Sequence, residues 1–232
     1  MKYYAKEASV YNTTHGSDLY GTDYNIKKHY MDIFTKHIPR NGPILEFGAG
    51  TGKFSSIFKE FSNECFLADF SIEMMLMNRE KSLPRICADT ENLPFCDNYF
   101  DCCIGVATFS YVPDKTQGLS EIIRVLKPGG KILILDQNRI SFIFILSRLY
   151  YLRHRKYNRQ PQISQSNLQF YKRLFEDAGL ITEEYGTCSW IPHAFDTVPA
   201  KLLIPFDFIM SHLPIIKDYA MRLFIVGQKV KD

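Results

Sequence analysis

Residues 43–54, PILEFGAGTGKF, place an acid and three glycines where a chain could hold a nucleotide. The short apolar run that ends near Glu46 is typical of a buried parallel strand. Gly48, Gly50 and Gly52 then supply a tight turn whose backbone can approach a ligand closely, and a helix is expected from about Lys53. A strand, a glycine turn and a helix start together predict a nucleotide-type pocket at the carboxyl edge of a sheet.

Three glycine motifs compete for this turn. A phosphate-binding P-loop needs G-x-x-x-x-G-K-[ST], but Phe47 replaces its first glycine and Phe54 its hydroxyl residue. A dinucleotide fingerprint G-x-G-x-x-G fits Gly48 and Gly50, yet Lys53 stands where a small residue is needed. The third pattern, E-x-G-x-G-x-G, fits throughout. The P-loop is excluded, and the NAD interpretation stays open at this point.

Further strands are expected to end at the same edge of the sheet. Residues 64–69 predict a second strand that ends in Asp69, about 20 residues after the glycine turn. An acid there can accept both hydroxyls of a ribose, although it can also simply cap a helix, as can Ser71. Strands are also expected at residues 85–88, before Asp89, and at 100–106 and 131–136, with an amphipathic helix at 119–126 stopped by Pro128-Gly129-Gly130.

These motifs, taken in order, resemble class I S-adenosylmethionine (SAM)-dependent methyltransferases of the small-molecule type, as in quinone and secondary-metabolite biosynthesis. The tract RVLKPGG at residues 124–130 discriminates best, because dehydrogenases have no reason to carry it. The resemblance covers residues 40–136 well. It implies an α/β, Rossmann-like fold: a seven-stranded, mostly parallel sheet with the last strand antiparallel, helices on both faces and small cap insertions.

The resemblance also implies roles for the matching positions. Glu46 would attract the methionine end of SAM, Asp69 would bind the ribose, and Asp89 with the Thr90 amide would bind the adenine. Phe70 or Met74 would lie against the adenine face, although core packing is an alternative for Met74. The residues expected to contact SAM, or its product S-adenosylhomocysteine, are Tyr11, Tyr20, Glu46, Gly48, Ala49, Gly50, Gly52, Asp69, Phe70, Met74, Asp89, Thr90 and Val106.

Methyl transfer from SAM needs alignment of the two reactants more than it needs a base, because the sulfonium already makes the methyl group electrophilic. Where the acceptor is protonated, Tyr111, His15, His193 and His154 are candidate bases. Related enzymes often carry a histidine in the loop where this chain has Phe-Ser-Tyr at residues 109–111, which leaves the base open. Carboxylates are too sparse near strand five for a magnesium site, and we expect no metal.

Two regions outside the cofactor scaffold are expected to define the substrate. Residues 1–38 form a tyrosine-rich lid, or alternatively a helix fastened to the domain by its tyrosines; residues 39–136 form the SAM-binding core; and residues 137–165 and 189–217 are cap insertions. An apolar stretch and a basic run occupy residues 140–159. They suit a cap for an anionic substrate, a peripheral membrane contact or a solvated face.

Composition agrees with one α/β domain of 232 residues, with a net charge of +3 and six cysteines that show no metal-binding spacing. The early charges argue against a signal peptide, and reduced cysteines fit a cytoplasmic setting. We therefore expect an enzyme that methylates an O, N or C atom of a small, anionic or amphipathic molecule, and do not expect a nucleic-acid substrate. The alternatives are a non-catalytic SAM-binding regulatory or partner protein and an NAD-dependent oxidoreductase. The oligomeric state is not predicted.

Overall fold

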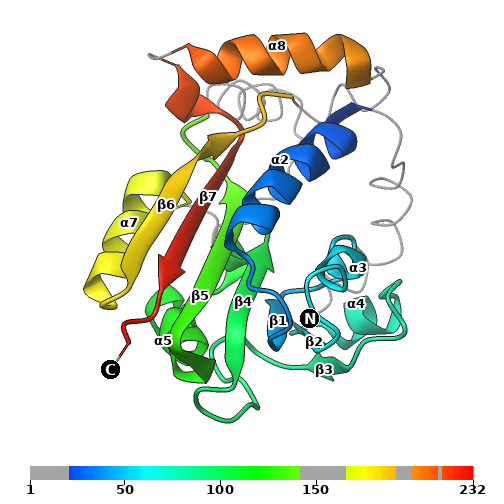
Figure 1. Ribbon diagram of the computed structural model, residues 1–232, viewed down its shortest axis with the longest axis vertical. Helices are drawn as coiled ribbons and strands as arrows, with labels where there is room; N and C mark the ends of the chain where they lie inside the picture. Colours follow the sequence, from blue (N-terminus) through cyan, green and yellow to red (C-terminus); the bar gives the residue numbers. More distant parts are fainter. Residues whose placement is uncertain (1–20, 142–165, 192–199, 214–215, 232) are drawn as a thin grey trace, which may run out of the picture.

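The computed structural model describes residues 21–141, 166–191, 200–213 and 216–231 (Figure 1). In chain order the described elements are α2 (Gly21–His37), β1 (Ile44–Phe47), α3 (Ser55–Phe58), β2 (Cys65–Asp69), α4 (Ile72–Leu76), β3 (Arg85–Cys87), β4 (Phe100–Val106), the 3₁₀ helix η1 (Phe109–Tyr111), α5 (Lys115–Val125), β5 (Leu126–Gln137), α7 (Leu168–Asp177), β6 (Ile181–Cys188), α8 (Ala200–His212), η4 (Lys217–Tyr219) and β7 (Arg222–Gln228). Within these ranges, no helix combines the length and the apolar character needed to cross a membrane.

The seven strands form one sheet in the order β3-β2-β1-β4-β5-β7-β6. All neighbouring pairs from β3 to β5 are parallel, whereas β7 is antiparallel to both β5 and β6. The expected fold class is therefore confirmed, including the antiparallel last strand between the fifth and sixth. Because β1 to β5 are parallel, their carboxyl ends meet at one edge of the sheet, and β6 ends at this edge too.

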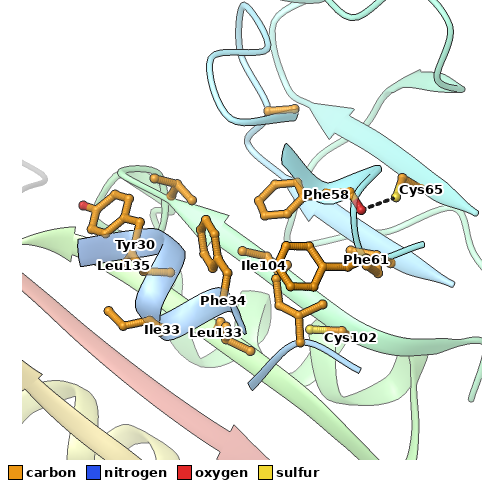
Figure 2. Close-up of a cluster of buried hydrophobic side chains, with 14 of the residues drawn as sticks. Tyr30, Ile33, Phe34, Phe58, Phe61, Cys65, Cys102, Ile104, Leu133 and Leu135 are labelled. Carbon is orange, nitrogen blue, oxygen red and sulfur yellow. Dashed lines mark hydrogen bonds between the residues drawn. The ribbon is translucent and has the colours of Figure 1, made fainter. Parts of the chain in front are cut away.

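Helices cover both faces of the sheet, as expected, because the strand side chains alternate between two apolar cores. On one face α2 contributes Tyr30 and Phe34, which pack with Phe58 and Ile104 (Figure 2). On the other face α5 and α7 cover a second core that begins at Leu45 of β1. The neighbours Ile44 and Leu45 are both fully buried but belong to different cores, which identifies β1 as a central strand.

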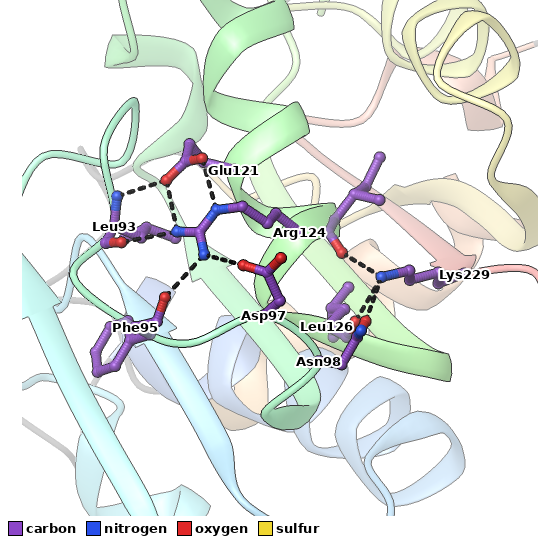
Figure 3. Close-up of polar contacts among 9 residues, drawn as sticks. Leu93, Phe95, Asp97, Asn98, Glu121, Arg124, Leu126 and Lys229 are labelled. Carbon is purple, nitrogen blue, oxygen red and sulfur yellow. Dashed lines mark hydrogen bonds and ion pairs between the residues drawn. The ribbon is translucent and has the colours of Figure 1, made fainter.

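The motif at residues 124–130 fastens the loop before β4 to α5 (Figure 3). The Arg124 guanidinium bonds the Glu121 and Asp97 carboxylates and the carbonyls of Leu93 and Phe95, at 2.6–2.9 Å. Five donors on one planar group allow this many bonds at once. The tract that discriminated best in the sequence therefore has a structural role on the β4–α5 side of the sheet.

Three element boundaries differ from expectation. The amphipathic helix expected at residues 119–126 is α5, which begins four residues earlier, at Lys115, because the Asp114 side chain caps it there. The fifth strand begins at Leu126 instead of residue 131, because Leu126 already pairs with Phe100 of β4. Gly129 takes a φ of +77° inside this strand, and its N–H donates to the Lys229 carbonyl at 2.9 Å. The helix expected from about Lys53 is also shorter, since regular α-helix is confined to Ser55–Phe58.

Candidate cofactor site at the carboxyl edge of the sheet

The turn after β1 requires glycine for two separate reasons. Gly48 and Gly52 have φ values of +65° and +79°, in the left-handed region that side chains disfavour. A Cβ atom on Gly48 would lie 1.8 Å from Thr108 Oγ1, and one on Gly52 would lie 2.4 Å from Asn78 Oδ1. The turn is thus packed against the chain that follows β4 and α4, and no larger residue fits these positions unchanged.

Asp69 at the end of β2 holds this turn. Its Oδ2 accepts the Gly50 N–H and its Oδ1 accepts the Ser71 N–H, both at 2.8 Å. Burial raises the pKa of the Asp69 carboxyl, while the two backbone donors act in the opposite direction. Ser71, not Asp69, caps α4, because its hydroxyl accepts the Met74 N–H at 3.3 Å. Asp69 therefore fixes the glycine turn at the carboxyl edge of the sheet.

Glu46, in β1 just before the turn, is a buried acid that forms no ion pair with a described residue. Only 3% of the residue is exposed, and Ser55 at the start of α3 donates its hydroxyl to Glu46 Oε2. Burial raises the pKa of Glu46 to about 8; the Ser55 hydrogen bond lowers it and the Asp69 charge raises it. A cation bound nearby would favour the charged carboxylate, so this acid suits an ammonium group.

A hollow of about 390 Å³ opens beside Asp69. Its lining is Phe70, Ser71, Ile72, Glu73, Cys87, Ala88 and Asp89. Phe70 and Ile72 are each 53% exposed, which offers an apolar wall to a planar group. Two of the predicted contact residues, Phe70 and Asp89, thus line one hollow. A larger hollow, of about 640 Å³, is lined by residues 113–116 and by α7, and contains none of the predicted residues.

Other predicted residues take different places. Met74 is buried and does not line the hollow, as its core-packing alternative anticipated. Asp89 Oδ1 accepts the Glu91 N–H at 3.0 Å, which fixes the turn that contains Thr90. Val106 is buried at the end of β4, two residues before Thr108, whose side chain packs on the glycine turn.

Tyr111 ends η1, and a buried network holds this short helix at the sheet edge. Asp136 is fully buried, and its carboxylate accepts the Ser110 N–H and hydroxyl at 2.7 and 2.9 Å and the Tyr171 hydroxyl at 3.0 Å. Burial raises the pKa of Asp136, and these donors counteract it. Asn138 donates to carbonyls of residues 218 and 220. The Asp136 and Asn138 side chains thus bond protein groups, and the described ranges contain no cluster of three metal-ligating side chains.

Several predicted residues lie outside the described part of the chain: Tyr11, His15, Tyr20, His154 and His193. Of the N-terminal tyrosines, Tyr30 is 1% exposed, and its ring packs against Phe34 and Phe54. At Tyr30 the tyrosine fastens a helix to the domain, which was the alternative to a lid.

Two residues of the site, Asn78 and Ser55, were not predicted from the sequence. Asn78 is fully buried after α4, and its Nδ2 donates to the Gly50 carbonyl at 3.0 Å. A polar residue at the end of the apolar run 74–77 was the available signal for it. Ser55 bonds Glu46, nine residues earlier, and its position one turn beyond the glycines was the only hint.

Comparisons with known proteins agree with this geometry. Residues 45–134 match the family Methyltransf_11, a methyltransferase domain. The chain is 33% identical over 161 residues to the ubiquinone/menaquinone biosynthesis C-methyltransferase UbiE of Proteus mirabilis, which covers 64% of this chain and 62% of the relative. It is 41% identical over 97 residues to the demethylmenaquinone methyltransferase of Corynebacterium urealyticum, and this match covers 40% of this chain and 40% of the relative. The chain thus spans less than two thirds of these relatives.

A solved structure shares the whole fold. The protein in complex with the Haloferax volcanii Trm112 methyltransferase activator superposes with a TM-score of 0.70 at 20% identity, over 98% of this chain and 97% of its own. The expected resemblance over residues 40–136 is confirmed by the family match, which covers nearly the same span.

Proposed function

We propose that this chain, whose residues 45–134 match a methyltransferase domain, is a class I SAM-dependent methyltransferase that transfers the methyl group of SAM to a small-molecule acceptor. The observation that carries the proposal is the glycine turn clamped between Asp69 and Asn78 at the carboxyl edge of a sheet with an antiparallel β7. The antiparallel strand also weighs against the NAD-dependent oxidoreductase, whose fold has no need of it. Nothing in the structure favours a non-catalytic SAM-binding protein.

The residues at the edge fit SAM. The two oxygens of Asp69 each accept one backbone N–H, so each keeps a lone pair for a ribose hydroxyl. The hollow between Phe70 and Asp89 offers an apolar wall and a carboxylate to adenine. Glu46 would attract the amino-acid ammonium group directly or through water, and would itself ionise in response.

Bound SAM would supply a methyl group that is already electrophilic. The protein then has to orient the acceptor in line with it and exclude water. The network of Asp136, Ser110 and Tyr171 holds η1, and with it Tyr111, at the end of β4. We propose Tyr111 as a residue that faces the acceptor. A base from Tyr111, His15 or His193 is needed only where the acceptor arrives protonated.

We propose that residues 137–165 and 189–217 cap the substrate, and that within residues 1–38 the part before α2 acts as the lid, because α2 itself packs in the core through Tyr30. The names of the relatives make demethylmenaquinone-type quinones the first acceptors to assay, with a carbon atom as the site of transfer. Anionic or amphipathic small molecules of other classes form the second panel. All six cysteines are free thiols, which supports action in the cytoplasm.

Calorimetric titration of the purified chain tests the proposal. We expect SAM and S-adenosylhomocysteine to bind and NADH not to bind at the same concentrations. Transfer of a radiolabelled methyl group from SAM to a demethylmenaquinol then separates an enzyme from a binding protein. Binding of NADH without SAM would contradict the methyltransferase proposal, and SAM binding with no transfer to any panel member would favour the non-catalytic alternative.

A further inference from the structure

Helix α8 turns an apolar face outward. Leu202, Phe206, Ile209 and Leu213 are spaced four, three and four residues apart, so they form one stripe, and they are 64%, 47%, 58% and 43% exposed. Phe208, 62% exposed, and the exposed Pro205 and His212 extend the stripe. We call these seven residues the α8 outer face. A surface helix of a globular protein normally turns its polar side chains to water, and α8 does the opposite.

The opposite side of the helix is firmly attached to the domain. Asp207 is 2% exposed, and its carboxylate bonds His29 of α2 at 2.6 Å and the N–H of Trp190 after β6. A buried carboxylate with two such donors fixes the rotation of α8. The outward direction of the apolar face is therefore set by the fold.

The helix lies at the edge of the sheet that carries the cofactor site. It connects the end of β6 to the start of β7, and both lie at the carboxyl edge, where Figure 1 shows α8 across one end of the molecule. A surface that docks on the α8 outer face would therefore meet the protein at its functional end.

We propose that the α8 outer face docks on a membrane surface that contains anionic lipids. A second copy of the chain is a poorer occupant, because a stable interface needs about 800 Å² from each partner. A 13-residue helix is about 20 Å long and about 10 Å wide, which offers roughly 200 Å². A lipid surface needs no such area of matched shape and accepts Phe, Leu and Ile side chains directly.

The charge of the chain supports an anionic surface. The Arg139 N–H donates to the Ser166 carbonyl at 2.9 Å, so residues 139 and 166 lie side by side. Asn138 in turn bonds the carbonyls of Asp218 and Ala220, directly after η4. By sequence, residues 142–165 carry five cations and no acid: Arg148, Arg153, Arg155, Lys156 and Arg159. This segment is not part of the proposed surface; its cations, together with the net charge of +3, make the chain as a whole favour an anionic over a neutral lipid surface.

Vesicle flotation of the full chain tests the proposal without SAM or acceptor, so its result is independent of the methyltransferase assignment. The probes are phosphatidylcholine vesicles with and without phosphatidylglycerol. The variant Phe206→Glu/Ile209→Glu places two charges on the face. The matched control, Ile181→Glu/Val230→Glu, changes two aliphatic residues of similar exposure, 52% and 48%, at the opposite edge of the sheet. Melting temperature and circular dichroism confirm that each variant folds.

We expect the wild type and the control to float with the phosphatidylglycerol vesicles, and the α8 variant to bind at least about tenfold more weakly. Weaker binding of the wild type to pure phosphatidylcholine vesicles than to vesicles with phosphatidylglycerol would support the role of lipid charge. The proposal is overturned if the wild type floats with neither vesicle, or if a folded α8 variant floats like the wild type. Light scattering that shows a wild-type dimer abolished in the α8 variant, without vesicle binding, would overturn it in favour of a second copy.

Discussion

The two halves of the sheet are held together by different kinds of contact. Around β1 and β2, the glycine turn is fixed by bonds between residues close in sequence, such as Gly50 and Asp69, 19 positions apart. Around β6 and α8, the fixing pairs are His29 with Asp207 and His37 with Glu184, which are 178 and 147 positions apart. The first half is a compact unit of strand and turn motifs, whereas the second depends on side chains that meet only in the folded chain.

The halves also differ in how they treat buried acids. Asp207 faces His29, which can carry a positive charge. Within the described part of the chain Glu46 has the Ser55 hydroxyl as a hydrogen-bond donor and no ion pair, and burial raises its pKa to about 8. A buried acid without a cation costs stability when it ionises, and such a cost is typical of a site that waits for a charged ligand. The difference supports the proposal that the ligand binds in the β1–β2 half.

The largest expected effect is on the free energy of unfolding, and it tests the contrast between the two halves at Glu46. Its pKa is about 8 in the folded chain and 4.5 ordinarily, so the folded state keeps a proton that the unfolded chain releases. Stability should therefore fall as the pH rises from 4.5 to 8, on the order of 4 kcal/mol in total. Urea unfolding at pH 5, 6.5 and 8 measures the slope. Glu46→Gln should remove this component, and parallel curves for the two proteins would refute the assignment.

A second comparison uses two glycines with similar backbone angles. Gly48 in the first half and Gly179 in the second have φ values of +65° and +73°, but a Cβ on Gly179 meets no atom within 4 Å. Gly48→Ala should lower the free energy of unfolding by about 3 kcal/mol, from backbone strain and the clash with Thr108. Gly179→Ala should cost only about 1 kcal/mol, from strain alone. Thermal unfolding distinguishes them, and equal losses would mean that the turn is not tightly packed.

The smallest expected effect is on SAM affinity, and it compares one aspartate from each half of the sheet. Asp69→Ala should weaken SAM binding by about 1–3 kcal/mol, because the ribose and the Gly50 N–H both lose an acceptor. Asp207→Ala should lower the melting temperature by releasing α8, but leave SAM affinity within about twofold. Calorimetry with SAM measures both. An unchanged affinity in Asp69→Ala would show that the ribose binds elsewhere.

Much of the first half followed from the sequence. The bounds expected for strands one to four agree with β1 to β4 to within a residue at each end, because short apolar runs bounded by glycines and acids specify buried parallel strands. The convergence of Asp69 with Gly50 also followed, since adjacent parallel strands end together. The start of β5 was missed, because a proline and two glycines normally interrupt pairing and here the pairing continues around them.

The side chains that support the site could not be predicted from the sequence in the same way. Asn78 supports the glycine turn and Ser55 the Glu46 carboxylate through side-chain bonds, and their residue types alone do not distinguish them from ordinary helix-end residues. The shift of the Glu46 pKa depends on complete burial, which is a property of the packed layers. The roles assigned to Tyr111 and to the other contact residues stay predictions until SAM is bound.

The sequence by itself determined the class of the domain, the glycine turn and the acids that follow two neighbouring strands, because these depend on local spacing and on the geometry of parallel strands. Only the tertiary structure decided that Glu46 is buried without an ion pair to a described residue, that Ser71 and not Asp69 caps α4, and that α8 is fixed with its apolar face outward. Burial and long-range pairing decide these features, since His29 and Asp207 carry no mark in the sequence that predicts their meeting.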